Sequence, residues 1–532
     1  MNLGVRKEDE ASQMTLMIGS RDSDVEQSRQ YIPSVLDKGL RDWLSASLKE
    51  GELIEGGFLY HGSLRSGEDD KRSIAAFFNV DKARLQFDPE WPALDSLAGM
   101  IHIDNHNVEG HIIDGFLYGT RLSSAAINVA REAGHLRLDL NAVAKGDAAD
   151  GMKILKETPL ASLTAEVTGD WQGKGSADYR LALNLPLTDK DPKAEKVDFS
   201  AHLHDADLFI PSLDIKFSEV SGNLNFISGR GLSSKNLTAN LWGERFHIVA
   251  GDFGENMQFQ SDQNVSVKLS GRVNAETLTQ WTELPALSFL RGVTEAEIHL
   301  SVIDGDVSLT AESDLVGVQV ELPDRYFKSA EQVQMTRLQW PLDDGPQDMR
   351  IEIDNKAYMQ FLLENEQLLG GSIYLGGSDQ SSSVELGKLT VSGAVDVFTL
   401  DAWDAALDRY IEAEQRLGGG QSADVPLSAE GVEIERLYAF GEQFDQSVIS
   451  AHALAGYWHI SIENQMLQGV ISVPESDDPA VRYRASMQYL RLPGRDLNDS
   501  STVQAETFWS LPDAWVPIDV TIDQLYMADE PY

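Results

Sequence analysis

Apolar and polar residues alternate with a period of two along most of the chain. Side chains of an extended strand point alternately to opposite faces, so this pattern predicts strands with one apolar and one polar face. The clearest stretches are residues 136–140, 179–185, 296–302, 458–462 and 518–522. The sequence therefore predicts a mostly β protein built on an elongated, twisted antiparallel sheet, whose apolar face must meet a partner.

Three segments interrupt the alternation and follow helical spacing instead. They are residues 33–49, 276–291 and 399–417. Pro33 suits a first helical turn, whereas Pro285 is expected to kink or split the second helix. Thr399 is a candidate cap for the third helix, and the glycines at 418–420 are expected to end it. We expect these few amphipathic helices to cap the sheet.

The pattern divides the chain into four expected segments. Residues 1–50 form a strand, a loop and a helix, and residues 51–397 form a β-groove. Residues 398–420 form a helix and a glycine-rich hinge, and residues 421–532 continue the groove. Residues 434–438 (IERLY) recur as residues 522–526 (IDQLY), but only the first copy is followed by a run of strands. We therefore expect the chain to be a fragment, truncated at the C-terminus.

Composition removes several classes of function. The 532 residues carry a formal net charge of −42, which argues against nucleic acid, because phosphate binding needs clustered Lys and Arg. The same charge disfavours adsorption onto anionic lipid surfaces. There is no cysteine, so disulfides, thiolate metal sites and cysteine nucleophiles are excluded. No apolar run in the sequence is long enough for a signal or membrane-spanning segment.

The best metal-like cluster is His202 and His204, followed by Asp205 and Asp207. Two histidines at i and i+2 share one strand face and could bind one ion. The metallo-hydrolase pattern His-x-His-x-Asp-His is not met, since Ala206 takes the Asp place. We therefore interpret the cluster as structural, and we predict no catalytic residue, no metal ligand and no cofactor.

The alternation itself is the remaining candidate for function. In one interpretation, the apolar faces close on each other as a sandwich or barrel core. In the other, an open and curved sheet holds lipid acyl chains on its concave apolar face, since large uncovered apolar faces aggregate or bind something. The pattern alone leaves both interpretations open.

Five blocks of the sequence resemble the YhdP branch of the AsmA-like proteins, relatives of TamB and of bridge-like lipid transfer proteins. The fourth block has Leu322, Pro323 and Lys328 at the family spacing, and the fifth reads FTLDAW. The blocks occur in the family order and are residues 32–64, 83–103, 271–300, 313–330 and 398–403.

The resemblance implies a periplasmic protein that is anchored in the inner membrane by an N-terminal helix, and the pattern predicts no such helix in these 532 residues. Its body would be a long β-groove that moves phospholipid between the inner and outer membranes and maintains the outer-membrane permeability barrier. Its partners would be phospholipid acyl chains and the two membranes or their proteins.

Candidate groove-lining residues are the apolar members of three alternating strands. They are Leu181, Leu183, Leu185, Ile298, Leu300, Val302, Ile460 and Ile462. Two rival functions remain at this point. One is a structural envelope scaffold with a closed β-core, and the other is a periplasmic hydrolase with paired carboxylates.

Overall fold

The computed structural model describes most of the chain. The described residues are 2–8, 11–28, 42, 45–63, 71–87, 89–105, 107–132, 135–158, 161, 170–186, 196–211, 214–228, 230–251, 265–303, 306–342, 345–364, 367–377, 384–417, 425–476, 481–492, 518–527 and 530–531. The chain forms two compact units. Unit 1 is Met1–Leu269 with Ser301–Gly305, and unit 2 is Ser270–Leu300 with Asp306–Tyr532.

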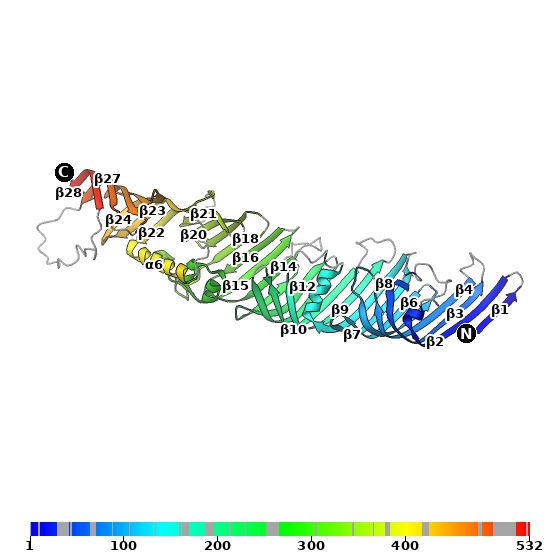
Figure 1. Ribbon diagram of the computed structural model, residues 1–532. Coiled ribbons are helices and arrows are strands. Elements are labelled where there is room, and N and C mark those ends of the chain that lie inside the picture. The colour runs from blue at the N-terminus through cyan, green and yellow to red at the C-terminus, as the bar shows by residue number, and fades with distance from the viewer. Residues whose placement is uncertain are drawn as a thin grey trace. The chain divides into compact units, whose positions relative to one another are not determined.

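Unit 1 is a long twisted sheet whose strands lie side by side in chain order (Figure 1). Every strand from β1 to β12 pairs antiparallel with the strand that follows it. The strands are β1 (Asn2–Glu8), β2 (Ala11–Asp24), β3 (Leu48–Ser63), β4 (Arg72–Leu85), β5 (Leu94–Asp104), β6 (Asn107–Leu117), β7 (Thr120–Glu132), β8 (His135–Asp147), β9 (Gln172–Pro186), β10 (Lys196–Ile210), β11 (Ile215–Ile227), β12 (Gly231–Leu241) and β13 (Glu244–Ala250).

Unit 2 is also mostly β, and its sheet is mixed. Strands β14 (Val265–Asn274) and β15 (Leu290–Ile303) contribute residues to both units. The strands of unit 2 are β16 (Asp306–Ser313), β17 (Val318–Val320), β18 (Thr336–Pro341), β19 (Gln347–Ile353), β20 (Ala357–Glu364), β21 (Gln367–Leu375), β22 (Leu389–Thr399), β23 (Leu427–Ala439), β24 (Glu442–Leu454), β25 (Tyr457–Glu463), β26 (Leu467–Pro474), β27 (Tyr483–Leu492), β28 (Ile518–Met527) and β29 (Glu530–Pro531).

The predicted antiparallel sheet is confirmed for most strands, but three pairings are parallel: β21–β22, β22–β23 and β27–β28. A parallel pair needs a long crossover connection, and the β22–β23 connection contains a helix of 17 residues. Both copies of the IERLY-type repeat lie on strands that enter by a parallel pairing, β23 and β28. The repeat therefore marks a recurring topological step.

Helices are few. Those that lie fully within the described residues are α1 (Val25–Ser28), α3 (Ala148–Glu157), α5 (Ala275–Thr282), η5 (Pro285–Phe289), η6 (Asp324–Tyr326) and α6 (Leu400–Arg416). The split at Pro285 and the helix after Thr399 are confirmed. Of the predicted helix 33–49, residues 33–41, 43 and 44 lie outside the described residues, as do the predicted hinge glycines 418–420. No helix among the described residues is long and apolar enough to cross a membrane.

Tight hairpins connect several strands. Two-residue turns of type I′ need positive φ at both positions, which favours glycine at the second. Three turns in the described part of the chain meet this condition, with φ of 54° and 81° at Trp242–Gly243, 55° and 79° at Phe440–Gly441, and 54° and 79° at Ala455–Gly456. These turns keep consecutive strands in register, so that apolar side chains stay on one face.

Candidate functional site

The register of unit 1 aligns apolar side chains into rows that run across the strands. We call the face that carries these rows the inner face and the opposite one the outer face. The first row is Ile18, Phe58, Ala76, Ile103, Val108, Val129, Leu138 and Leu185. The second row is Phe78, Ile101, Gly110, Ile127, Leu140, Leu183 and Val197. The third row is Val80, Gly99, Ile112, Ala125, Ala142, Leu181, Phe199, Phe226 and Leu232.

Unit 2 has a longer row of the same kind, which we call the long apolar row. Each member is the direct cross-strand partner of the next, and none is polar. The row is Ala311, Leu338, Ile351, Met359, Ile373, Val391, Ala429, Ala451, Ile460, Ile471, Ala485 and Val520. It crosses strand β16 and every strand from β18 to β28, which at about 4.8 Å per strand corresponds to roughly 50 Å of sheet.

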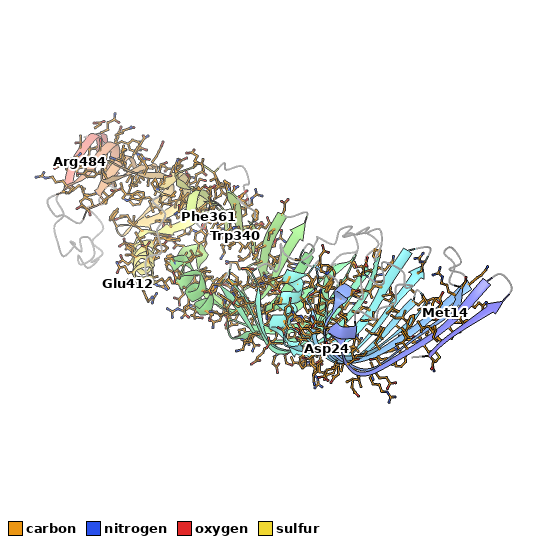
Figure 2. All side chains as sticks on the ribbon, turned by 45° about the vertical axis from the view of Figure 1, so that its right-hand side comes forward. Met14, Asp24, Trp340, Phe361, Glu412 and Arg484 are labelled. Atoms are coloured by element: carbon orange, nitrogen blue, oxygen red, sulfur yellow. The ribbon has the colours of Figure 1, made fainter. Side chains whose placement is uncertain are left out.

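One residue along each of the same strands, the other face carries a row with no apolar member. It is Thr310, Gln339, Arg350, Gln360, Ser372, Thr390, Ser428, His452, His459, Ser472, Arg484 and Asp519. Figure 2 shows the side chains of this unit, with Trp340 of β18 and Phe361 of β20 labelled. Along these two rows the sheet of unit 2 thus has hydrocarbon on one face and polar groups on the other.

The two units differ in how far the inner face is exposed. In unit 1 the centre of the first row is closed, because Ile103 is 0% and Val108 2% exposed. In unit 2 every member of the long apolar row except Ala485 remains partly or largely exposed, and Val520 reaches 53%. An apolar face that stays open to water is typical of a binding surface.

The structure brings the predicted groove residues of β9 together. Leu185, Leu183 and Leu181 each belong to one of the three rows of unit 1. Leu183 is 3% exposed, whereas the other two are half-buried. All three pack in one cluster with Tyr179 and Phe199. Period-two alternation therefore predicted their common face correctly, and their assignment to a groove stays a prediction.

The other predicted residues belong to unit 2 or adjoin the division between units. Ile460 lies in the long apolar row, and Ile462 pairs with Ile449 and Gly469 in the next row. Ile298 and Leu300 on β15 are half-buried. The side chain of Val302 lies outside the described residues.

Three of the family-like blocks meet at a junction beside α6. The Asp324 carboxylate accepts hydrogen bonds from the Thr399 amide at 2.9 Å, the Thr399 hydroxyl at 2.7 Å and Trp403 Nε1 at 3.0 Å. The Trp403 ring stacks on Phe398 with centroids 5.7 Å apart and meets Tyr326 edge-on at 5.8 Å. The Asp324 carboxylate therefore accepts the hydrogen bonds of the amide and hydroxyl at the start of α6. The predicted cap, Thr399, makes no side-chain capping bond of its own.

Glu321 secures the other end of the same junction. Its carboxylate lies 2.9 Å from Arg409 on α6 and 3.2 Å from Arg291 on β15. The Arg409 guanidinium also sits 4.9 Å from the centre of the Phe289 ring. The junction holds η5, η6 and α6 against one another within unit 2, and sequence reasoning did not foresee these contacts.

Tyr326→Phe is expected to leave unit 2 as stable as before or up to about 1 kcal/mol more stable. Among the described residues the buried Tyr326 hydroxyl finds no hydrogen-bond partner, and such a group costs free energy. Burial also raises the pKa of Tyr326 to about 12, so the phenol remains neutral. Thermal unfolding measures the change. Tyr179→Phe is the matched control and is expected to lose about 1 kcal/mol, because the Tyr179 hydroxyl donates to Asp147 O at 2.9 Å. A clear loss at Tyr326 would contradict the prediction.

The histidine cluster is satisfied by neighbouring side chains on the outer face. His202 Nδ1 lies 2.7 Å from Asn223 Oδ1, and His204 Nε2 lies 3.2 Å from Asp178 Oδ2. His204 and Lys145 together lower the pKa of Asp178. Within the described part of the chain, no group of three or more His, Asp or Glu side chains could hold a metal ion.

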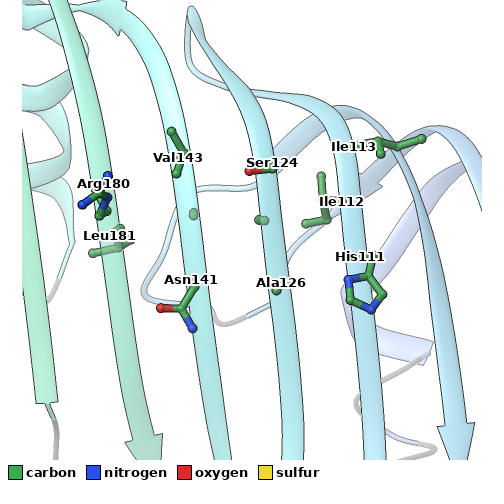
Figure 3. Close-up of a pocket in the computed structure, with 11 residues that line it drawn as sticks. His111, Ile112, Ile113, Ser124, Ala126, Asn141, Val143, Arg180 and Leu181 are labelled. Carbon is green, nitrogen blue, oxygen red and sulfur yellow. The ribbon is translucent and has the colours of Figure 1, made fainter.

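A shallow hollow on the outer face of unit 1 crosses β6 to β9 (Figure 3). Its floor is low because Ser124 and Ala126 are small, and Ile113 and Val143 rise on either side. The hollow is open to solvent, and no hydrogen bond joins its serine, Ser124, to its histidine, His111. The inner faces, and not this hollow, are the surfaces whose chemistry is extended and uniform.

Comparison with known proteins gives one match. The model of the family described as YhdP protein matches residues 2–532. No curated protein matches the chain, and no solved structure does.

Proposed function

Because the chain belongs to the YhdP family, we propose that it is a non-enzymatic lipid carrier whose inner faces hold phospholipid acyl chains. Its task is to pass phospholipid between the inner and outer bacterial membranes and so to maintain the outer-membrane permeability barrier. Its place is the periplasm, and its partners are the two membranes or their proteins.

The long apolar row is the observation that carries the proposal. It offers partly exposed hydrocarbon on strand after strand, with an entirely polar row behind it. Adjacent positions are equivalent, so an acyl chain gains and loses similar contacts as it moves along the row.

The energetics favour such a surface. Each methylene group removed from water contributes about 0.8 kcal/mol, so a two-chain phospholipid faces a barrier on the order of 20 kcal/mol when it crosses water unaided. A continuous apolar row lowers that barrier without binding the lipid tightly at any one position. The formal net charge of −42 disfavours adsorption onto anionic headgroups, so the inner face rather than the outer face contacts lipid.

The test is to purify the chain from a bacterial envelope under mild conditions and to extract it for lipid mass spectrometry. We expect several phospholipids per chain. A lipid-free, monodisperse protein would overturn the proposal.

The closed centre of the inner face in unit 1 favours a second candidate, a structural envelope scaffold. Side chains such as Ile103, at 0% exposure, already bury one another as a protein core does. The lipid measurement separates the candidates, because a scaffold carries no stoichiometric lipid.

A further inference from the structure

Helix α3 covers the inner face of unit 1 beside β8 and β9. It starts at Asp147, whose side chain accepts a hydrogen bond from the Ala149 amide at 2.8 Å. Its two large buried side chains, Ile154 and Leu155, belong to the same cluster as Leu183 and Phe199. Aliphatic side chains of α3 therefore cover the part of the inner face where Leu183 of the second row and Phe199 of the third row lie.

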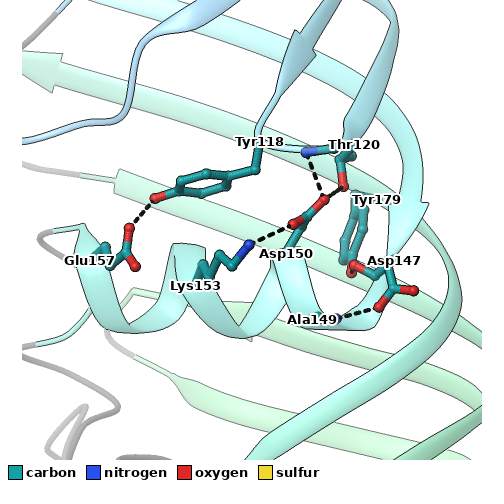
Figure 4. A network of polar contacts seen from close by, with 9 residues as sticks. Tyr118, Thr120, Asp147, Ala149, Asp150, Lys153, Glu157 and Tyr179 are labelled. Carbon is teal, nitrogen blue, oxygen red and sulfur yellow. Dashed lines mark hydrogen bonds and ion pairs between the residues drawn. The ribbon is translucent and has the colours of Figure 1, made fainter.

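A polar latch ties α3 to the turn between β6 and β7 (Figure 4). Asp150 Oδ2 accepts from the Gly119 amide at 3.0 Å and from the Thr120 hydroxyl at 2.9 Å. The Tyr118 hydroxyl donates to Glu157 Oε2 at 2.6 Å. Asp150 is only 6% exposed and Thr120 only 2%. We call these five residues the latch.

The polar contacts of the latch differ from the apolar contacts that α3 makes with the sheet. Met152 packs against the same cluster as Ile154 and Leu155. The remaining buried residues of α3 are two small ones, Ala148 and Gly151, and the carboxylate Asp150. A helix that served only to complete a core would bury a continuous apolar stripe. In α3 the buried side of the helix includes a carboxylate, Asp150, which holds the helix to the turn by hydrogen bonds instead of apolar packing.

We propose that the inner face beneath α3 is a gated binding site for a single lipid acyl chain. With the latch closed, Ile154 and Leu155 fill the site. With the latch open, α3 moves aside and hydrocarbon takes the place of those two side chains against Leu181, Leu183 and Phe199. The occupant is aliphatic, because the site is lined by apolar side chains and is already filled by aliphatic ones. The inference rests on the proposed lipid-carrying function.

A disulfide across the latch tests the gate. The chain has no cysteine, so Thr120→Cys with Asp150→Cys introduces the only two thiols, on two residues whose side-chain oxygens Oγ1 and Oδ2 lie 2.9 Å apart. The whole chain, oxidised or reduced, is incubated with phosphatidylethanolamine and phosphatidylglycerol vesicles that contain a phospholipid with a photoreactive acyl chain. Cross-links are counted by mass spectrometry in peptides of β9–β10 and of β25–β26.

We expect the oxidised protein to have at least about tenfold fewer cross-links in β9–β10 than the reduced protein, and reduction to restore them. The number of cross-links in β25–β26 should not change. Thr120→Cys alone, treated with the same oxidant, is the control. Asp150→Asn weakens the latch without a cross-link and is expected to raise labelling of β9–β10 severalfold.

Equal labelling of β9–β10 in locked, reduced and Asp150→Asn proteins would overturn the gate while leaving the carrier function intact, provided β25–β26 is labelled. Absence of labelling in β25–β26 as well would instead overturn the proposed function. If β25–β26 is labelled but β9–β10 is not labelled under any condition, the proposal of a lipid site beneath α3 is wrong.

Discussion

Ile460→Asp is expected to reduce the phospholipid that the chain carries by roughly tenfold or more. Ile460 is half-buried in the long apolar row, between Ala451 and Ile471. An aspartate in a hydrocarbon environment costs about 2.5–3.5 kcal/mol, and each 1.4 kcal/mol is tenfold in occupancy. In the proposed path a lipid moves along the row past this strand, so one charge at Ile460 is expected to interrupt the row on both sides of it.

The sheet itself is expected to survive this change. Ile460 keeps contact with water in the native structure, so the new carboxylate stays solvated when no lipid is present. The loss of stability should lie near the ordinary value of about 1 kcal/mol for a point substitution. Leu183 is a poorer choice, because it is 3% exposed and a charge there would unfold the surrounding core.

Ser461→Asp is the matched control. It places the same charge one residue along β25, on the outer face opposite Ser450. Lipid extracted per chain and transfer between vesicles measure both variants, and the control is expected to match the parent protein. If Ile460→Asp carries the normal amount of lipid, the long apolar row is not part of the lipid path.

The alternation predicted the strands and their faces because the period of two is a local property of the backbone. Leu183 and Ile460 therefore fell on apolar inner faces as expected. What the alternation could not show is the register between strands. The rows arise from turns such as Phe440–Gly441 and from parallel pairings such as β22–β23, whose geometry depends on long connections.

Helix α3 was missed because it is only ten residues long and lies between two strong strand signals. A local signal existed, since Asp147 stands where an N-cap belongs and Ile154 and Leu155 follow at helical spacing. The junction at α6 could not be predicted at all. Asp324 and Thr399 are 75 residues apart, and nothing local in either segment indicates that they meet.

Lys328→Met is expected to destabilise unit 2 by about 3 kcal/mol or more. The ammonium of Lys328 is buried at 1% exposure and donates to the backbone oxygens of Leu315 at 2.7 Å, Val318 at 2.7 Å and Ser329 at 3.0 Å. All three of its protons are therefore used. Burial lowers the pKa of Lys328, and these three acceptors hold the group in place. Methionine fills a similar volume but removes the three hydrogen bonds from the ammonium, each worth about 1.5–3 kcal/mol. Leu315 O and Ser329 O keep backbone hydrogen bonds, from Val318 N at 3.1 Å and Gln332 N at 3.3 Å, so only part of that energy is lost.

Lys356→Met is the control, because the Lys356 ammonium donates to the side-chain oxygen Gln334 Oε1 at 2.8 Å. This variant is expected to lose about 1 kcal/mol of stability. Native-state hydrogen exchange at β17 and β18 measures the local free energy of opening in both variants. The segment from Leu315 to Ala330 has little regular structure beyond the three-residue strand β17 and the one-turn helix η6. The buried Lys328 ammonium joins three carbonyls of this segment. It therefore fixes the conformation in which η6 and Asp324 contact α6. Equal protection in the two variants would show that the segment holds its shape without the cation.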